Sequence, residues 1–119
     1  MFELSAQGTF SAAHKVKGYK GDCAGIHGHT YKIDVMVRVE KLDKLGLALD
    51  FHKIKATLNT ILKKLDHKCL NNLTFFKNHN ATAEWIAVYV FREMKEKIKS
   101  VHSITVWEGS ENSVTYHES

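Results

Sequence analysis

Alternating apolar and polar side chains between residues 31 and 40 constrain the fold of this chain more than any other feature of its sequence. Every second residue there is apolar, in the series Tyr31, Ile33, Val35, Val37 and Val39. The residues between them are charged, apart from Met36. Because side chains alternate across a β-strand, the pattern predicts a strand from about Gly28 that buries one face.

A first helix is predicted after Asp50, which occupies an N-cap position. Apolar residues then recur at helical spacing: Phe51, Ile54, Leu58, Ile61, Leu62 and Leu65. The pattern ends near Asp66 and His67, and a polar loop is expected over residues 71–80. A second helix is predicted after Thr82, which is also a suitable N-cap. Its apolar side consists of Trp85, Ile86, Tyr89, Val90, Met94 and Ile98.

Extended segments flank the two predicted helices. Residues 2–14 are expected to form a strand, and the glycine-containing segment 15–27 a loop. Residues 103–108 and 112–118 are expected to form a hairpin. The predicted order is therefore ββααββ, an α+β fold in one domain over residues 1–119, with a four-stranded antiparallel sheet and two helices on one face. Such a sheet has two open edges, which invite pairing with another subunit.

Charge and cysteine content narrow the range of functions. The net charge is +4, but only two of the 17 basic residues are arginine, on which nucleic-acid binders rely, so no nucleic-acid partner is expected. No apolar run approaches the length that crosses a bilayer, and the N-terminus does not resemble a secretory signal, so no membrane partner is expected. The two cysteines, Cys23 and Cys69, form no disulfide framework, and reduced thiols in a cytoplasmic protein are expected.

Three histidines are candidates for a metal site. His27 and His29 are two residues apart at the start of a predicted strand, so their imidazoles project from the same face. His14 ends the preceding strand and lies beside them if the two strands pair as a hairpin. Three imidazoles suit Zn²⁺ with a fourth position open, as in catalytic zinc sites. Cys23 leaves an alternative, because it could instead be the fourth ligand of a closed, structural site, and spacing alone does not decide between the two.

Six short motifs, in an order and spacing that span nearly the whole chain, resemble the 6-pyruvoyltetrahydropterin synthase family. They are F-S-A-A-H (10–14), C-A-G-I-H-G-H (23–29), L-D-F (49–51), L-D-H (65–67), T-A-E (82–84) and W-E-G (107–109). Within that family, the three-residue gap between Cys23 and His27 is similar to that of the bacterial 6-carboxytetrahydropterin synthases of queuosine (7-deazaguanine) biosynthesis. The family's usual proline before Thr82 is Ala81 here, which is expected to loosen the entry to the helix without affecting the chemistry.

The resemblance implies a role for each residue that matches a catalytic position. Cys23 would be the general base and not a metal ligand. Asp66 and His67 would form a proton-handling pair with it, although as sequence neighbours they need not face each other. The zinc ligands would be His14, His27 and His29.

The resemblance also implies a small-molecule substrate. The enzyme would be a lyase that converts 7,8-dihydroneopterin triphosphate to 6-carboxy-5,6,7,8-tetrahydropterin, acetaldehyde and triphosphate. Glu108 would anchor the pterin ring, because a carboxylate matches the two adjacent N–H donors of its 2-amino-4-oxopyrimidine edge. Thr82 and Glu84 would lie in a segment that lines the pterin pocket. Three lysines of the loop before Cys23 are candidates for contacts with the triphosphate: Lys15, Lys17 and Lys20.

The implied fold is the tunnelling fold, or T-fold, in which sheets join edge to edge into barrels, and the implied assembly is a homohexamer of two trimers. Two alternatives stay open. The first is a pyruvoyl-forming synthase, which eliminates triphosphate without cleaving a carbon–carbon bond. The second is a non-catalytic module stabilised by zinc, with Cys23 as a ligand. Taken alone, Glu108 also suits a solvated hairpin residue, and Asp66 with His67 a pair at a helix end.

Overall fold

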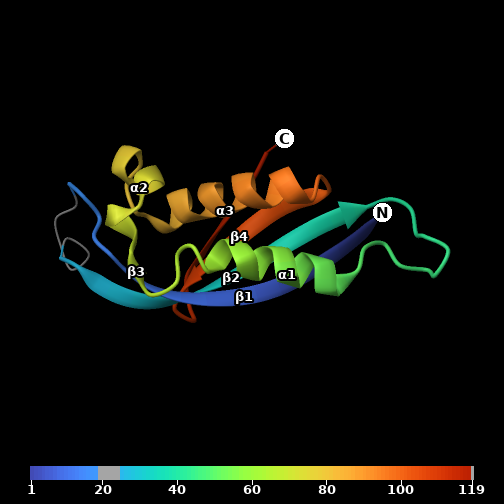
Figure 1. The fold of residues 1–119 in the computed structure, drawn as a ribbon, viewed down its shortest axis with the longest axis horizontal. Coiled ribbons are helices and arrows are strands. Elements are labelled where there is room, and N and C mark those ends of the chain that lie inside the picture. The colour runs from blue at the N-terminus through green and yellow to red at the C-terminus, as the bar shows by residue number, and fades with distance from the viewer. Residues whose placement is uncertain (19–24, 119) are drawn as a thin grey trace.

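The computed structural model of the protein describes residues 1–18 and 25–118. Its centre is one sheet, in which the strands follow the spatial order β3-β1-β2-β4-β5. The strands are β1 (Phe2–His14), β2 (His27–Val39), β3 (Lys68–Cys69), β4 (Val101–Glu108) and β5 (Ser113–His117). The long antiparallel pair β1 and β2 runs the length of the molecule and carries the predicted alternation, since β2 buries every second residue from Tyr31 to Val37 (Figure 1).

Two long helices cover the face of the sheet to which these apolar residues point. Helix α1 (Phe51–Leu62) packs on β1, and α3 (Ala83–Lys97) packs on β4 and β5 (Figure 1). Both predicted N-caps are confirmed, because the side chain of Asp50 accepts from the backbone N–H of His52 and that of Thr82 from the N–H of Trp85. The α+β class and the two helices on one face were therefore correctly predicted.

The prediction of a four-stranded antiparallel sheet was wrong, because β3 adds a fifth strand that runs parallel to β1. Two contacts bring this segment to the edge of β1. The backbone N–H of Ser11 donates to Asp66 Oδ1 over 2.9 Å, and the N–H of His67 donates to the carbonyl of Ser11 over 2.6 Å. A strand of two residues is too short to show a period, so its pairing is decided by these contacts with a distant strand.

The stretch between α1 and α3 is also more ordered than predicted. Helix α1 ends at Leu62, and a series of turns, not a helix, continues to His67, whose φ of 58° lies in the left-handed region. The expected polar loop over 71–80 instead contains a 3₁₀ turn, η2 (Leu70–Asn72), and a third α-helix, α2 (Thr74–Asn78). Residues 1–18 and 25–118 therefore contain three α-helices where the sequence predicted two, and the predicted order ββααββ was wrong because β3 and α2 lie between the two long helices. Helix α2 has little more than one turn, which is too few residues to show helical spacing.

Close packing between α1 and β1 depends on Gly8. A Cβ atom at this position would lie 2.9 Å from Leu62 Cδ1 and 3.2 Å from Leu58 Cδ2. Both leucines are buried, so they have little room to move. The absence of a side chain at Gly8 thus lets α1 lie directly on the sheet and fixes the height of the helical layer above β1.

Candidate functional site

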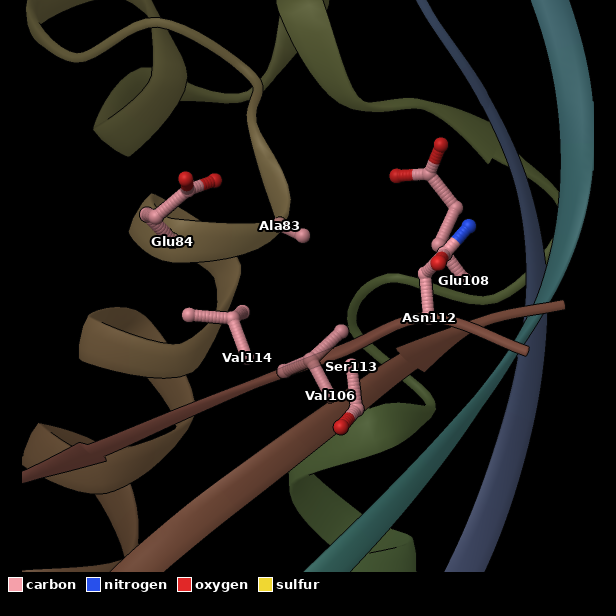
Figure 2. A pocket seen from close by; sticks show the side chains of 7 residues that line it. All are labelled: Ala83, Glu84, Val106, Glu108, Asn112, Ser113 and Val114. Carbon is pink, nitrogen blue, oxygen red and sulfur yellow. The ribbon is translucent and has the colours of Figure 1, made fainter. Parts of the chain in front are cut away.

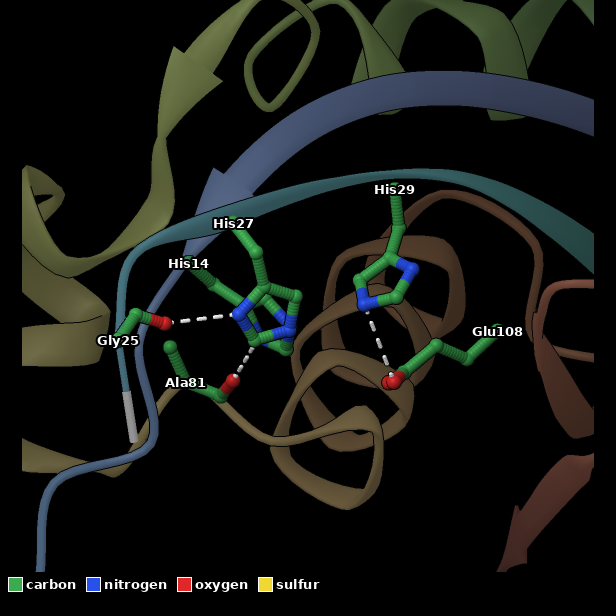
Figure 3. Close-up of polar contacts among 6 residues, drawn as sticks. All are labelled: His14, Gly25, His27, His29, Ala81 and Glu108. Carbon is green, nitrogen blue, oxygen red and sulfur yellow. Dashed lines mark hydrogen bonds and ion pairs between the residues drawn. The ribbon is translucent and has the colours of Figure 1, made fainter. Parts of the chain in front are cut away.

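Three histidine side chains meet where β1 and β2 face each other at one end of the sheet. The strand register places His14 opposite His27, and His29 two residues further along β2. The ring centroids of the three imidazoles lie 4.6 to 5.2 Å apart. The expected hairpin therefore brings together the three residues that were predicted as metal ligands (Figure 3).

Glu108 reaches the same cluster from β4. Its Cα pairs with that of Tyr31 on β2, and its Oε1 lies 3.3 Å from His29 Nε2. Within the described residues, the ligand atoms of the three histidines and Glu108 all lie within 4.8 Å of one another. The sequence predicted Glu108 as a substrate contact, and the structure places it beside the histidines as well.

Backbone carbonyls fix the orientation of two of the rings. His14 Nδ1 donates to the carbonyl oxygen of Ala81 over 2.6 Å, and His27 Nδ1 donates to that of Gly25 over 2.8 Å. A carbonyl oxygen only accepts, so each neutral ring has its proton on Nδ1 and a lone pair on Nε2. The two Nε2 atoms lie 3.1 Å apart.

This donor set fits a metal ion. Donor atoms on a tetrahedral zinc ion lie about 3.3 Å apart, because each is about 2.0–2.1 Å from the ion. The separations of 3.1 Å between His14 and His27 and 3.3 Å between His29 and Glu108 are close to that value. Burial lowers the pKa of His14, although the Ala81 carbonyl and the charge of Glu108 oppose the effect. The lowered pKa favours the neutral imidazole, which is the form that binds metals.

A cavity of about 220 Å³ adjoins the cluster on the side of Glu108. Glu84 and Glu108 lie on opposite sides of it (Figure 2). The other lining residues are Ala83, Val106, Asn112, Ser113 and Val114. Thr82, by contrast, uses its hydroxyl to cap α3 and is not part of this lining. The lining combines carboxylates, an amide and aliphatic side chains, which suits a small ligand with polar edges.

Asp66 and His67 form a pair at the β3 edge. Asp66 Oδ2 lies 2.9 Å from His67 Nδ1, so the neighbours do face each other, through the left-handed backbone of His67. The N–H of Ser11 is the main cause that lowers the pKa of Asp66, with a contribution from His67. His67 and His29 both line a second cavity of about 430 Å³ at the sheet edge, but the His67 side chain is 84% exposed. Cys23 and Lys20 lie outside the described residues.

Two asparagines that the sequence did not single out hold the segment after His14. Asn71 accepts from the N–H of Lys15 and donates to its carbonyl, and Asn80 does the same with Lys17. Each side-chain amide therefore makes the same pair of backbone hydrogen bonds that a neighbouring strand would make. The sequence did not predict this role, because it arises only when the segment that contains the asparagines folds against the end of β1.

The chain is similar in sequence to proteins of one known family. The model of the family described as 6-pyruvoyl tetrahydropterin synthase matches residues 3–119. The chain is 30% identical to the 6-carboxy-5,6,7,8-tetrahydropterin synthase of Haemophilus influenzae, over 99% of this chain and 100% of that protein. It is 32% identical to the dihydroneopterin monophosphate aldolase of Pyrococcus furiosus, over 89% of each chain.

A solved structure shows the same fold. The 6-pyruvoyl tetrahydropterin synthase of Caenorhabditis elegans superposes with a TM-score of 0.89, at 27% identity over 99% of this chain and 96% of that one. Among residues 1–18 and 25–118, no helix has the length and apolar character that a membrane span requires.

Proposed function

Because this chain belongs to the 6-pyruvoyl tetrahydropterin synthase family, we propose that it is a zinc-dependent lyase that forms 6-carboxy-5,6,7,8-tetrahydropterin. The substrate is 7,8-dihydroneopterin triphosphate, and acetaldehyde and triphosphate are released with uptake of water. One observation carries the proposal: three imidazoles and a carboxylate converge beside a cavity of the size of a small ring system. The Haemophilus relative, whose name states this product, supports the choice within the family.

Zinc is held by His14, His27 and His29 in this proposal. The carbonyls of Ala81 and Gly25 support it, because they hold the Nδ1 atoms and leave the Nε2 atoms of His14 and His27, 3.1 Å apart, available to the ion. The bound ion supplies Lewis acidity, which stabilises negative charge on the side-chain oxygens of the substrate.

Glu108 and the cavity beside it bind the pterin ring. A carboxylate that accepts two parallel hydrogen bonds matches the adjacent N–H donors of a 2-amino-4-oxopyrimidine edge. Glu84 and Asn112 line the same cavity and are available to the remaining polar atoms of the ring. Thr82 positions this lining indirectly, since its hydroxyl caps the helix on which Ala83 and Glu84 lie.

Cys23, Asp66 and His67 move protons in this proposal. Asp66 orients the His67 imidazole and stabilises its charged form, which suits a group that takes up and returns a proton. The exposure of His67 suits action across a subunit boundary. The thiolate of Cys23 acts as the base, and a nearby cation lowers the pKa of such a thiol from about 8.5.

Assembly, pathway and location stay predictions. The edge strands of the described sheet are β3 and β5, whose unpaired backbone groups are available to neighbouring subunits in the homohexamer implied by the resemblance. A role in queuosine biosynthesis and a cytoplasmic location rest on the same resemblance. Lys15 and Lys17, both exposed, remain candidates for triphosphate contacts together with Lys20.

Product analysis tests the proposed reaction. Zinc-loaded protein is incubated with 7,8-dihydroneopterin triphosphate, and acetaldehyde and the pterin product are measured. Acetaldehyde with a 6-carboxypterin is the expected result. Triphosphate release without acetaldehyde would indicate the pyruvoyl-forming reaction, which the fold of the Caenorhabditis enzyme favours as the second candidate. Turnover of 7,8-dihydroneopterin monophosphate alone would indicate the reaction named for the Pyrococcus relative.

A Cys23→Ala variant separates catalysis from a structural zinc module. Loss of turnover with zinc still bound is expected of a base. Loss of zinc and of folding together would show that Cys23 is a ligand of a structural site.

A further inference from the structure

We propose that Glu108 alternates between two partners, closing the metal site as its fourth ligand when the cavity is empty and turning to the ligand when the cavity is filled. The ligand class is a planar heterocycle with two adjacent N–H donors, and this half of the inference rests on the proposed function. The other half, that Glu108 is the fourth ligand of the metal site, does not depend on the proposed function.

The contacts of Glu108 support a direct role in the metal site. Its Oε1 lies 3.3 Å from His29 Nε2 and within 4.8 Å of the donor atoms of His14 and His27. His29 Nε2 is buried and makes no hydrogen bond among the described residues, which leaves it available to an ion beside the carboxylate. Imidazole nitrogens and carboxylate oxygens are both zinc ligands, so the four side chains together could supply four-coordinate zinc.

The same carboxylate also borders the cavity. Glu108 lines it opposite Glu84, on the side where β4 ends (Figure 2). Its backbone is fixed, because it pairs with Tyr31 and its N–H donates to the carbonyl of Asn112 over 3.1 Å. Its side chain is 28% exposed and has rotatable bonds between this backbone and the carboxylate. Movement from one partner to the other therefore needs only a change of rotamer.

Charge decides which partner Glu108 takes. In the empty cavity its carboxylate would face the negative charge of Glu84, whereas the metal ion offers positive charge. A ligand edge with two N–H donors reverses this preference, because it forms two charge-assisted hydrogen bonds with the carboxylate. A coordination position then becomes free when a ligand occupies the cavity, which links ligand binding to activation of the metal site.

Cobalt(II) tests the fourth ligand, because four-coordinate Co²⁺ absorbs visible light far more strongly than Co²⁺ with more ligands. Metal-free full-length protein is titrated with Co²⁺ as wild type, Glu108→Gln and Glu111→Gln. Glu108→Gln is expected to bind Co²⁺ at least about tenfold more weakly, since loss of even an outer-shell partner costs about 10–100-fold, and to change the spectrum. Glu111→Gln is the matched control and should keep the wild-type affinity and spectrum, because Glu111 is an exposed carboxylate outside the donor cluster. Glu108→Asp, which keeps the charge on a shorter side chain, should change the spectrum in the same direction.

Unsubstituted pterin tests the exchange, because it has the 2-amino-4-oxopyrimidine edge but no side-chain oxygen for the metal. Added to Co²⁺-loaded wild type, it is expected to shift the spectrum, and it should leave that of Glu108→Gln unchanged. Wild-type affinity and spectrum in Glu108→Gln, with far-UV circular dichroism showing a folded protein, would overturn the fourth ligand. An unchanged wild-type spectrum with pterin bound, as measured by equilibrium dialysis, would overturn the exchange. Failure of pterin to bind at all would overturn the pterin site and the exchange together, while the Co²⁺ titration would still decide the fourth ligand.

Discussion

The Nδ1 atom of His14 donates to the carbonyl oxygen of Ala81 over 2.6 Å, and this bond joins the end of β1 to the start of α3. Ala81 is fully buried, and its own N–H donates to Asn80 Oδ1 over 3.2 Å. A proline at position 81 could not make this second bond. Ala81 is therefore held by Asn80, although the sequence suggested a looser entry to the helix at this position.

The metal site predicts a strong effect of His27→Ala. The variant removes one of two Nε2 donors that lie 3.1 Å apart, and His27 is only half-buried, so the fold should survive. Metal affinity should fall by about 100-fold or more. Loss of an outer-shell partner costs about 10–100-fold, and loss of a ligand itself should cost at least the upper value. Metal content after dialysis, measured by mass spectrometry, checks this expectation. His52→Ala, at an exposed histidine outside the cluster, is the control and should keep the wild-type metal content.

Asn80→Ala should weaken both stability and metal binding. The variant loses the bonds to both backbone groups of Lys17 and to the N–H of Ala81, whose carbonyl orients His14. The expected loss of unfolding free energy is about 1–2 kcal/mol, because a hydrogen bond contributes about 0.5–1.5 kcal/mol and the two bonds to Lys17 are exposed. Urea unfolding of the metal-free protein gives the stability, and a metal titration gives the affinity. Asn72→Ala, at an exposed asparagine, should change neither quantity, and equal metal affinity in Asn80→Ala would contradict the link to His14.

The lowered pKa of Asp66 predicts a pH-dependent contribution to stability. Its pKa is depressed in the folded protein, chiefly by the N–H of Ser11, so the ionised carboxylate stabilises the fold. This contribution is present above the unfolded-state pKa of about 3.9 and is lost as the pH falls through the lower folded-state value. Asp66→Asn should therefore lower the melting temperature at pH 6–7, and the difference from wild type should shrink towards pH 3.

Thermal unfolding between pH 3 and pH 7 measures this difference. Glu111→Gln is the control, because Glu111 is exposed and makes no hydrogen bond within the described part of the chain. A destabilisation by Asp66→Asn that stays constant across the range would contradict the role of the charge and indicate lost hydrogen-bond geometry alone.

Gly8→Ala should destabilise the protein by crowding the interface between α1 and β1. The new methyl group would meet Leu62 Cδ1 at 2.9 Å and Asn59 Oδ1 at 3.2 Å. Overpacking of this kind costs about 1–3 kcal/mol. Chemical denaturation measures it. Gly28→Ala, on the same hairpin but with its nearest new contact at 3.8 Å, should be close to neutral in the metal-free protein, and a similar cost in both variants would refute the packing explanation.

Local patterns predicted much of this fold. The alternation around Val35 indicated β2, Asp50 and Thr82 marked the starts of both long helices, and the H-x-H pair with His14 indicated a cluster of imidazoles. Each of these signals depends on residues that are close in sequence or on the pairing of consecutive strands, which are commonly neighbours in a sheet. They could therefore be recognised without knowledge of the rest of the chain.

The sequence by itself determined the main strands and long helices and predicted which side chains form the candidate site, because periodicity, caps and ligand spacing are local properties. Only the tertiary structure decided that Glu108 lies beside His29, since this depends on β4 pairing with β2 across the intervening helices. The same is true of the parallel pairing of β3 and of the asparagine contacts with Lys15 and Lys17. Such contacts join residues far apart in sequence, and no local pattern records them because their free energy depends on the complete fold.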